Sequence, residues 1–195
     1  MATKKRSSAN ESGWSSGSAG VLVGAAVAGA AIGLAANVGR KLFVQFTSGA
    51  TGNWSDALAT EHKMTLAVFD KIQATNDSQT MMRSHLLAKL KYALTKHALQ
   101  EENVIYPALR EAGERVDADH LTADHGYVKT YLYELEAMAK DDPSWLPRVA
   151  EFRTMIERHM REEEDDVFPR FRAWLSEEKD KELTALMNKE GFKFA

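Results

Sequence analysis

One eleven-residue pattern occurs twice in the sequence, 62 residues apart. The copies at residues 97–107 and 159–169 both read His-x3-Glu-Glu-x2-[Ile/Val]-[Tyr/Phe]-Pro. A lone histidine precedes each copy by a similar distance, His62 by 35 residues and His125 by 34. The chain therefore contains two copies of one unit, each long enough for a hairpin of two helices.

Apolar side chains recur at steps of three and four residues in four segments separated by short polar turns. These segments comprise residues 56–75, 79–111, 117–140 and 145–175. Amphipathic helices of similar length with short connections predict an all-α fold, an antiparallel four-helix bundle. Pro107 and Pro169 lie inside the periodic pattern and are expected to kink or end the second and fourth helices soon after each motif.

The motif places its histidine and its first glutamate four residues apart, one turn along a single helix face. Both lone histidines fall in the apolar stripe of their own helices. Unpartnered charged groups in a bundle core would cost several kcal/mol each, so a multivalent cation is expected to satisfy them. The six predicted metal ligands are His62, His97, Glu101, His125, His159 and Glu163.

Six ligands exceed what one tetrahedral zinc ion requires, but they suit two ions bridged by both carboxylates, with two imidazoles for each ion. Nitrogen and oxygen donors without sulfur fit iron or manganese and leave open positions for a small exogenous ligand. The sequence contains no cysteine, which excludes thiolate zinc sites and cysteine-bound iron–sulfur clusters. A non-haem di-iron centre is predicted, with manganese or zinc as less favoured metals.

Several polar residues near the motifs are predicted to have roles other than metal binding. His85 and His120 are expected on other faces of their helices, at the surface or beside the ligands. Glu102 and Glu164 are expected at a solvated acidic edge, with orientation of a ligand histidine as the alternative. Tyr106 is expected to be a packing residue, with a hydroxyl near the site as the alternative.

The N-terminal part of the chain differs in composition from the remainder. Residues 1–20 are rich in Ser and Gly and are predicted to form a disordered tail. Residues 21–46 are predicted to form a hydrophobic Ala/Gly-rich helix. Its uncharged part, residues 21–39, would span about 28 Å as a helix, close to the hydrocarbon thickness of a bilayer. A membrane anchor and a helix lying on the bundle or on a partner are the alternatives.

The predicted bundle, residues 56–175, is flanked by two further segments. Residues 47–55 are predicted to be a linker, with Ser55 or Asp56 capping the first helix. Residues 176–195 are predicted to be a charged C-terminal tail containing a short helix with a loose end.

Residues 56–172 resemble the hemerythrin-like, or HHE cation-binding, domain, whose hallmark is one histidine on each of four helices with two His-x3-Glu pairs. The resemblance implies a four-helix bundle around a non-haem di-iron centre and the same six ligands. Oxygen-carrying hemerythrins have a fifth histidine, where this chain has Leu121 and Lys129, and a last carboxylate that would correspond to Glu164 rather than Glu163. The ligand set here is more similar to that of bacterial proteins that repair iron centres.

The favoured function is a di-iron protein that binds or senses O2, NO or peroxide in a stress, redox or iron-handling role. The alternatives are a di-iron enzyme of peroxide or NO detoxification or of iron–sulfur centre repair, and a membrane-tethered scaffold with a structural metal. A net charge of −3 with scattered basic residues disfavours a nucleic-acid partner. A cytoplasmic location is expected, with inner-membrane association through residues 21–39 as an option, and no protein partner is identified.

Overall fold

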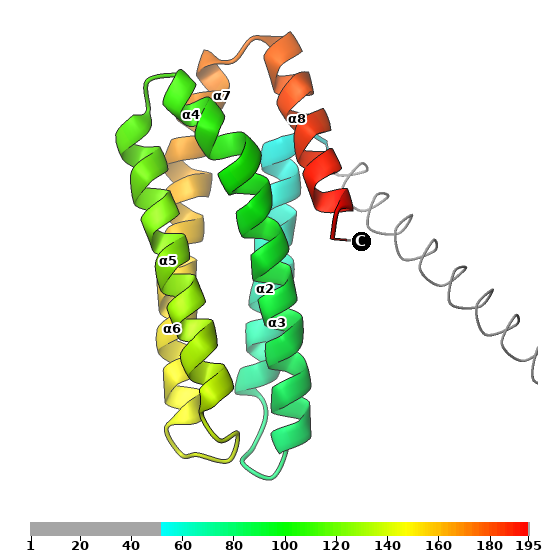
Figure 1. Ribbon diagram of the computed structural model, residues 1–195, viewed down its shortest axis with the longest axis vertical. Helices are drawn as coiled ribbons and strands as arrows, with labels where there is room; N and C mark the ends of the chain where they lie inside the picture. Colours follow the sequence, from blue (N-terminus) through cyan, green and yellow to red (C-terminus); the bar gives the residue numbers. More distant parts are fainter. Residues whose placement is uncertain (1–51, 195) are drawn as a thin grey trace, which may run out of the picture. The chain divides into compact units, whose positions relative to one another are not determined.

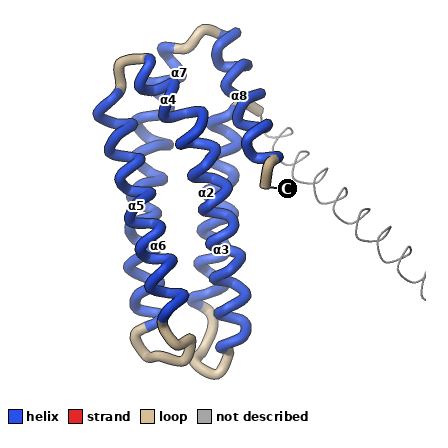
Figure 2. The backbone as a smooth tube through the Cα atoms, viewed as in Figure 1, coloured by secondary structure: helices blue, strands red, loops and turns tan. Residues whose placement is uncertain are grey.

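The computed structural model describes residues 52–194, and this part of the chain is helical without any strand (Figures 1 and 2). In chain order its helices are α2 (Trp54–Gln73), α3 (Thr80–Gln100), η1 (Glu101–Ile105), α4 (Tyr106–Glu111), α5 (Arg115–Ala137), α6 (Trp145–Glu162), η2 (Glu163–Val167), α7 (Phe168–Trp174) and α8 (Glu177–Phe192). The predicted tail at residues 1–20 and the predicted hydrophobic helix at residues 21–46 lie outside the described residues. Among the helices described, none has both the length and the apolar character needed to cross a bilayer.

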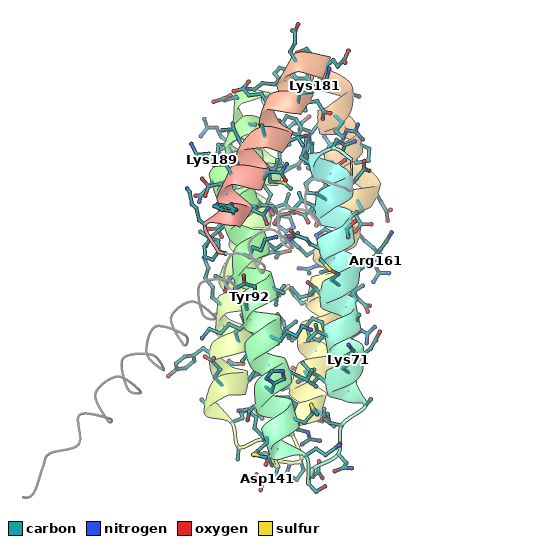
Figure 3. All side chains as sticks on the ribbon, turned by 90° about the vertical axis from the view of Figure 1, so that its right-hand side faces the viewer. Lys71, Tyr92, Asp141, Arg161, Lys181 and Lys189 are labelled. Atoms are coloured by element: carbon teal, nitrogen blue, oxygen red, sulfur yellow. The ribbon has the colours of Figure 1, made fainter. Side chains whose placement is uncertain are left out.

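Four helical columns pack in a ring, formed by α2, by α3–η1–α4, by α5 and by α6–η2–α7. Helix α2 packs against α3 and α6, and α5 packs against the same two helices from the other side. Columns that follow one another in the chain run antiparallel (Figure 1). Charged side chains such as Lys71 and Lys181 project from the outer surface of the bundle (Figure 3). The predicted all-α, antiparallel four-helix bundle is therefore confirmed.

The core of the bundle consists of two apolar clusters with a polar layer between them. One cluster includes Trp54 and Leu58, and the other includes Val68 and Phe69. On α2 the buried His62 lies between Leu58 and Val68, and α5 repeats this order with its own histidine. The helix stripes that predicted the core thus also place the histidines at one level of the bundle.

Each motif copy ends in a short π-helical segment. In η1 and η2 the backbone N–H of the residue before the proline donates to the carbonyl of Glu101 or Glu163, five residues earlier. In a regular α-helix the ring of a proline would clash with the carbonyl four residues before it, and the wider π turn relieves that clash. Pro107 and Pro169 consequently end neither column, since α4 and α7 continue beyond them. The two columns end at Glu111 and Trp174, soon after each motif as expected, and a π segment that the sequence did not predict lies before each proline.

Helix α2 begins earlier than predicted. The side chain of Asn53 caps it by accepting hydrogen bonds from the backbone N–H groups of Ser55 at 3.0 Å and Asp56 at 3.1 Å, so the expectation that Ser55 or Asp56 is the cap was wrong. Trp54, which falls in the predicted linker, is fully buried, and its indole N–H donates to Asp180 Oδ1 on α8 at 2.8 Å.

Helix α8 packs against α2, α3 and η1. Its N-cap is Ser176, whose hydroxyl accepts from the backbone N–H of Lys179 at 3.2 Å. Leu183 and Met187, four residues apart, are buried in the same apolar cluster as Trp54. The segment predicted to be a tail with a short helix and a loose end therefore supplies a sixteen-residue helix to the core.

Met187→Ala is expected to lower the free energy of unfolding by about 2–5 kcal/mol, because it leaves a cavity under α8. Met187 is 0% exposed, whereas Met81 is 85% exposed, so Met81→Ala is the matched control with an expected effect below about 0.5 kcal/mol. Urea unfolding followed by circular dichroism measures both changes. Equal effects of the two substitutions would show that α8 does not dock in solution.

Candidate metal centre

The six predicted ligands come together in the polar layer between the two apolar clusters. The four helical columns each supply one histidine, and two of the columns add a glutamate at the start of a π segment. All six side chains are buried, and the exposed fractions are His62 1%, His97 5%, Glu101 0%, His125 2%, His159 3% and Glu163 0%.

His62, His97, Glu101 and Glu163 form a first group, in which one donor atom of each residue lies within 4.8 Å of the others. His62 Nε2 lies 2.9 Å from His97 Nε2 and 3.4 Å from Glu163 Oε2. His97 Nε2 lies 3.2 Å from Glu101 Oε1. Two donors that bind one ion at about 2.1 Å and at a right angle are about 3.0 Å apart, so these separations suit a shared ion.

Glu101, His125 and His159 form a second group with the same limit of 4.8 Å between donor atoms. Glu101 Oε2 lies 3.3 Å from His125 Nε2, while its other oxygen faces His97. Glu163 Oε2 lies 3.5 Å from His159 Nε2 and also faces the first group. Each carboxylate therefore lies between two histidines of different groups, the arrangement that two ions sharing both carboxylates require.

Within the described residues, three donor atoms of this cluster are buried without any hydrogen-bond partner: Glu101 Oε1, Glu163 Oε2 and His159 Nε2. Buried polar atoms are rarely left in this state, because each unsatisfied one costs free energy. Divalent cations held by the two groups would satisfy these atoms. The residues present therefore fit a metal site.

Each of the four histidines has a carboxylate beside its second ring nitrogen. A carboxylate there keeps the proton on Nδ1, fixes the orientation of the ring and leaves the Nε2 lone pair for a metal. The Nδ1-to-oxygen distances are 2.6 Å for His62–Glu164, 3.1 Å for His97–Glu61, 3.0 Å for His125–Glu102 and 3.5 Å for His159–Asp124.

Glu102 and Glu164 take the orienting role that the sequence gave as an alternative, whereas Glu61 and Asp124 were missed. The duplication held a signal for both, because an acidic residue precedes each lone histidine. In all four pairs, however, the carboxylate and the imidazole come from neighbouring helices. Periodicity within one helix does not reveal such pairs.

The hydroxyl of Tyr106 enters the site, which was the alternative to a pure packing role. It donates to Glu163 Oε1 at 2.7 Å and lies 3.3 Å from Glu101 Oε2 and 3.2 Å from His125 Nε2. Burial and the charges of Glu101 and Glu163 raise the pKa of Tyr106 well above its usual value. The phenol therefore stays protonated and acts as a hydrogen-bond donor.

The two remaining histidines lie outside the cluster, as expected. His85 is exposed on α3. The side chain of His120 is 49% exposed, and its Nε2 lies 3.3 Å from Glu162 Oε2. His120, Asp124 and Glu162 make a smaller group at the surface, in which Arg158 also contacts Asp124, at 3.2 Å.

The family model for the hemerythrin HHE cation-binding domain matches residues 55–171. The chain belongs to the hemerythrin HHE cation-binding family. The matched region extends from the start of α2 into α7 and includes all six predicted ligands. The resemblance inferred from the two motifs is thereby confirmed.

Two curated proteins are similar to about two thirds of the chain. A protein named DNA nickase from Nostoc sp. is 28% identical over 126 residues, which cover 65% of this chain and 35% of the relative. An uncharacterized hemerythrin-like protein from Schizosaccharomyces pombe is 29% identical over 128 residues, which cover 64% of this chain and 62% of the relative. The chain thus spans less than two thirds of the length of either relative. No solved structure gives a significant match.

Without a metal, the hemerythrin-like cluster holds protons instead. Burial lowers the pKa of His97, but the charge and hydrogen bond of Glu101 outweigh burial and raise that pKa well above its usual value. Burial likewise opposes protonation of His159, yet the charge of Glu163 and the nearby Asp124 raise its pKa from 6.5 to about 9. A metal ion must displace these protons to bind, so metal binding is coupled to proton release.

His97→Ala is expected to lose most of the bound metal, because it removes a donor from the first group. His85→Ala, on the same helix but exposed, is expected to keep the metal content of the unaltered protein. Metal content per chain, measured by plasma emission spectrometry after purification, checks both. Equal losses would contradict the assignment of His97 to the site.

The stability of the metal-free protein is expected to fall as the pH rises from 6.5 through 9. Because the pKa of His159 is raised from 6.5 to about 9, folding stabilises its protonated form. That contribution is complete below the unfolded pKa and is lost above the folded one, on the order of 3 kcal/mol for this residue. Urea unfolding at pH 6.5 and 9.5 measures the fall, and His159→Gln should make it smaller. A rise in stability over this range would contradict the charge arrangement.

Proposed function

We propose that this hemerythrin HHE protein is a non-haem di-iron protein that binds or senses O2, NO or peroxide in a stress, redox or iron-handling role. The observation that supports this most is the set of buried, unpartnered donor atoms on Glu101, Glu163 and His159, at the meeting point of four histidines. A multivalent cation would stabilise such a set by satisfying the buried atoms.

The donor types favour iron or manganese over zinc. Four imidazoles and two carboxylates suit iron or manganese, and a tetrahedral zinc site would need fewer ligands. The described geometry divides the ligands into two groups that share Glu101. An iron pair, when bound, supplies reversible electron exchange and open positions for a small ligand.

The side chains around the cluster control how these ligands behave. Glu164, Glu61 and Glu102 hold protons on the Nδ1 atoms of His62, His97 and His125, so that the Nε2 atoms of these rings are free to bind. The two apolar clusters on either side of the polar layer exclude water from it. The Tyr106 hydroxyl keeps one proton at the centre of the site, directed at Glu163.

The name of the Nostoc relative concerns DNA cleavage, but we propose no nucleic-acid partner for this chain. Its net charge is −3. The half-buried groups around the cluster include the carboxylates of Glu102 and Glu164, whose charge would repel phosphate groups.

Iron analysis and absorption spectra of the full chain test this proposal. Purified after expression with added iron, the protein is expected to carry about two irons per chain and an oxo-to-iron absorption in the near ultraviolet. Manganese or zinc in place of iron, or a colourless metal-free protein, would contradict the di-iron assignment.

Exposure of the iron-loaded protein to O2, NO and hydrogen peroxide then separates binding from catalysis. Spectral changes that reverse on removal of the gas, without steady consumption, support a binding or sensing role. Continuous loss of peroxide or NO would support a detoxifying enzyme instead. Identical spectra with every ligand would support a metal that only holds the bundle together.

A further inference from the structure

A further set of candidate metal ligands lies at the surface of the second hairpin, which is formed by α5 and α6, outside the polar layer. His120 and Asp124 stand one helical turn apart on α5, and Glu162 is the last residue of α6. One donor atom of each residue lies within 4.8 Å of the others. His120 Nε2 is 3.3 Å from Glu162 Oε2, close to the separation of about 3.0 Å between two donors that share an ion at a right angle. We call these three residues the surface group.

The matching face of the first hairpin, formed by α2 and α3, is built differently. Ala57 stands five residues before the lone histidine of that hairpin, where the second hairpin has His120, and it is buried in an apolar cluster. Gln100 stands three residues after the motif histidine, where the second hairpin has Glu162. The Nε2 group of Gln100 donates to the carbonyl of Met187 on α8 at 3.2 Å. Helix α8 therefore covers this face of the first hairpin, whereas the side chains of His120 and Glu162 are 49% and 31% exposed.

Asp124 connects the surface group to the polar layer. Its carboxylate is buried, and its Oδ2 atom lies 3.5 Å from His159 Nδ1. Arg158 Nη2 lies 3.2 Å from both oxygens of Asp124, but the side chain of Arg158 is 60% exposed. The matching ion pair of the first hairpin, Lys96 with Glu61, is only 11% and 12% exposed. Because Arg158 is in contact with solvent, it can move away and leave the carboxylate of Asp124 to a cation.

His159 is anchored less firmly than the other three ligand histidines. Within the described residues, neither of its ring nitrogens has a hydrogen-bond partner, although the ring is buried. The Nδ1 atoms of the other three rings each lie within 3.1 Å of a carboxylate oxygen. The Nδ1 atom of His159 faces Asp124, and its Nε2 atom faces Glu163 in the polar layer. The ring therefore lies between the surface group and the internal ligands, and its rotation breaks no hydrogen bond.

From these observations we propose that the surface group binds one divalent transition-metal ion and that this ion passes by way of His159 into the polar layer. One imidazole and two carboxylates without sulfur suit Fe²⁺, Mn²⁺ or Zn²⁺. Binding at the surface needs no internal metal, whereas the passage rests on the proposed function. A plain ion pair between His120 and Glu162 would join α5 to α6 without binding metal, so counts of bound metal separate the two roles.

Titration of the purified full chain with Mn²⁺, with the free ion measured by electron paramagnetic resonance, tests the surface group. His120→Ala and Glu162→Gln are each expected to weaken one Mn²⁺ site about tenfold or more. His85→Ala, which removes an exposed histidine of α3, is the control and is expected to bind Mn²⁺ as the unaltered protein does. The difference between variants isolates the surface site whether or not the internal centre is filled. Equal Mn²⁺ binding by all four proteins would overturn the proposal.

Arg158→Gln is expected to tighten Mn²⁺ binding at the surface about fivefold, because it removes a positive charge that competes with the ion for Asp124. The control is Arg161→Gln, since Arg161 contacts Glu157 instead, and it is expected to leave Mn²⁺ binding unchanged. The same titration measures both variants. Unchanged or weaker Mn²⁺ binding by Arg158→Gln would show that the ion does not use Asp124.

The rate at which the metal-free full chain takes up Fe²⁺ without O2 tests the passage, with unbound iron trapped by a coloured chelator at set times. His120→Ala and Glu162→Gln are expected to slow uptake about tenfold and to reach the same final iron content as the unaltered protein. His85→Ala is expected to change neither quantity. Equal uptake rates in variants that have lost the surface Mn²⁺ would overturn the passage and leave the proposed function intact. An unaltered protein that takes up no iron would overturn both, and the Mn²⁺ titration would still show whether the surface group binds metal.

Discussion

The structure depends on the burial of six ionisable side chains at one level of a helical bundle. Imidazoles and carboxylates cost several kcal/mol each when they lose water without a partner, and apolar clusters close both sides of this level. The protein offsets that cost with carboxylates at each Nδ1 atom and with the Tyr106 hydroxyl. Among the described residues, the ligand atoms without a hydrogen-bond partner are Glu101 Oε1, Glu163 Oε2 and both ring nitrogens of His159. A cation bound in the polar layer would satisfy the two carboxylate oxygens and the Nε2 atom of His159.

The two adjacent glutamates of each motif have separate roles. Adjacent residues on a helix point about 100° apart, so two neighbouring glutamates cannot both bind one ion. Here Glu101 faces the metal positions, and Glu102 turns to the Nδ1 atom of His125 on the next helix. The π turn that begins at Glu101 also accommodates Pro107 in the continuing column. The column therefore continues into α4, whose Tyr106, Ala108 and Leu109 lie in the apolar cluster beyond the site.

The sequence predicted the features that lie along a single helix and missed most of those that join different helices. The four apolar stripes were sufficient to predict the four-helix bundle. The duplicated motif and the two lone histidines identified the six side chains that the structure brings together. The roles of Glu61 and Asp124 depend on the neighbouring helix that each one faces, which no stripe specifies. Trp54 was assigned to a linker because its partner, Asp180, is 126 residues away. The prolines predicted a kink or an end soon after each motif, and the π segments were missed because the steric rule for proline takes no account of a π turn.

The four pairs of a carboxylate and a histidine Nδ1 atom also show how the two helical hairpins depend on each other. Each hairpin orients one histidine with its own acid, His97 with Glu61 and His159 with Asp124. The other histidine of each hairpin contacts a carboxylate of the opposite hairpin: His62 contacts Glu164, and His125 contacts Glu102. A hairpin separated from the other one would keep its three predicted metal ligands, two histidines and a glutamate. Only one of its two imidazoles would still have a carboxylate beside Nδ1. Two such fragments would have to meet face to face, exchanging acids reciprocally like the subunits of a symmetric dimer, before either could retain an ion.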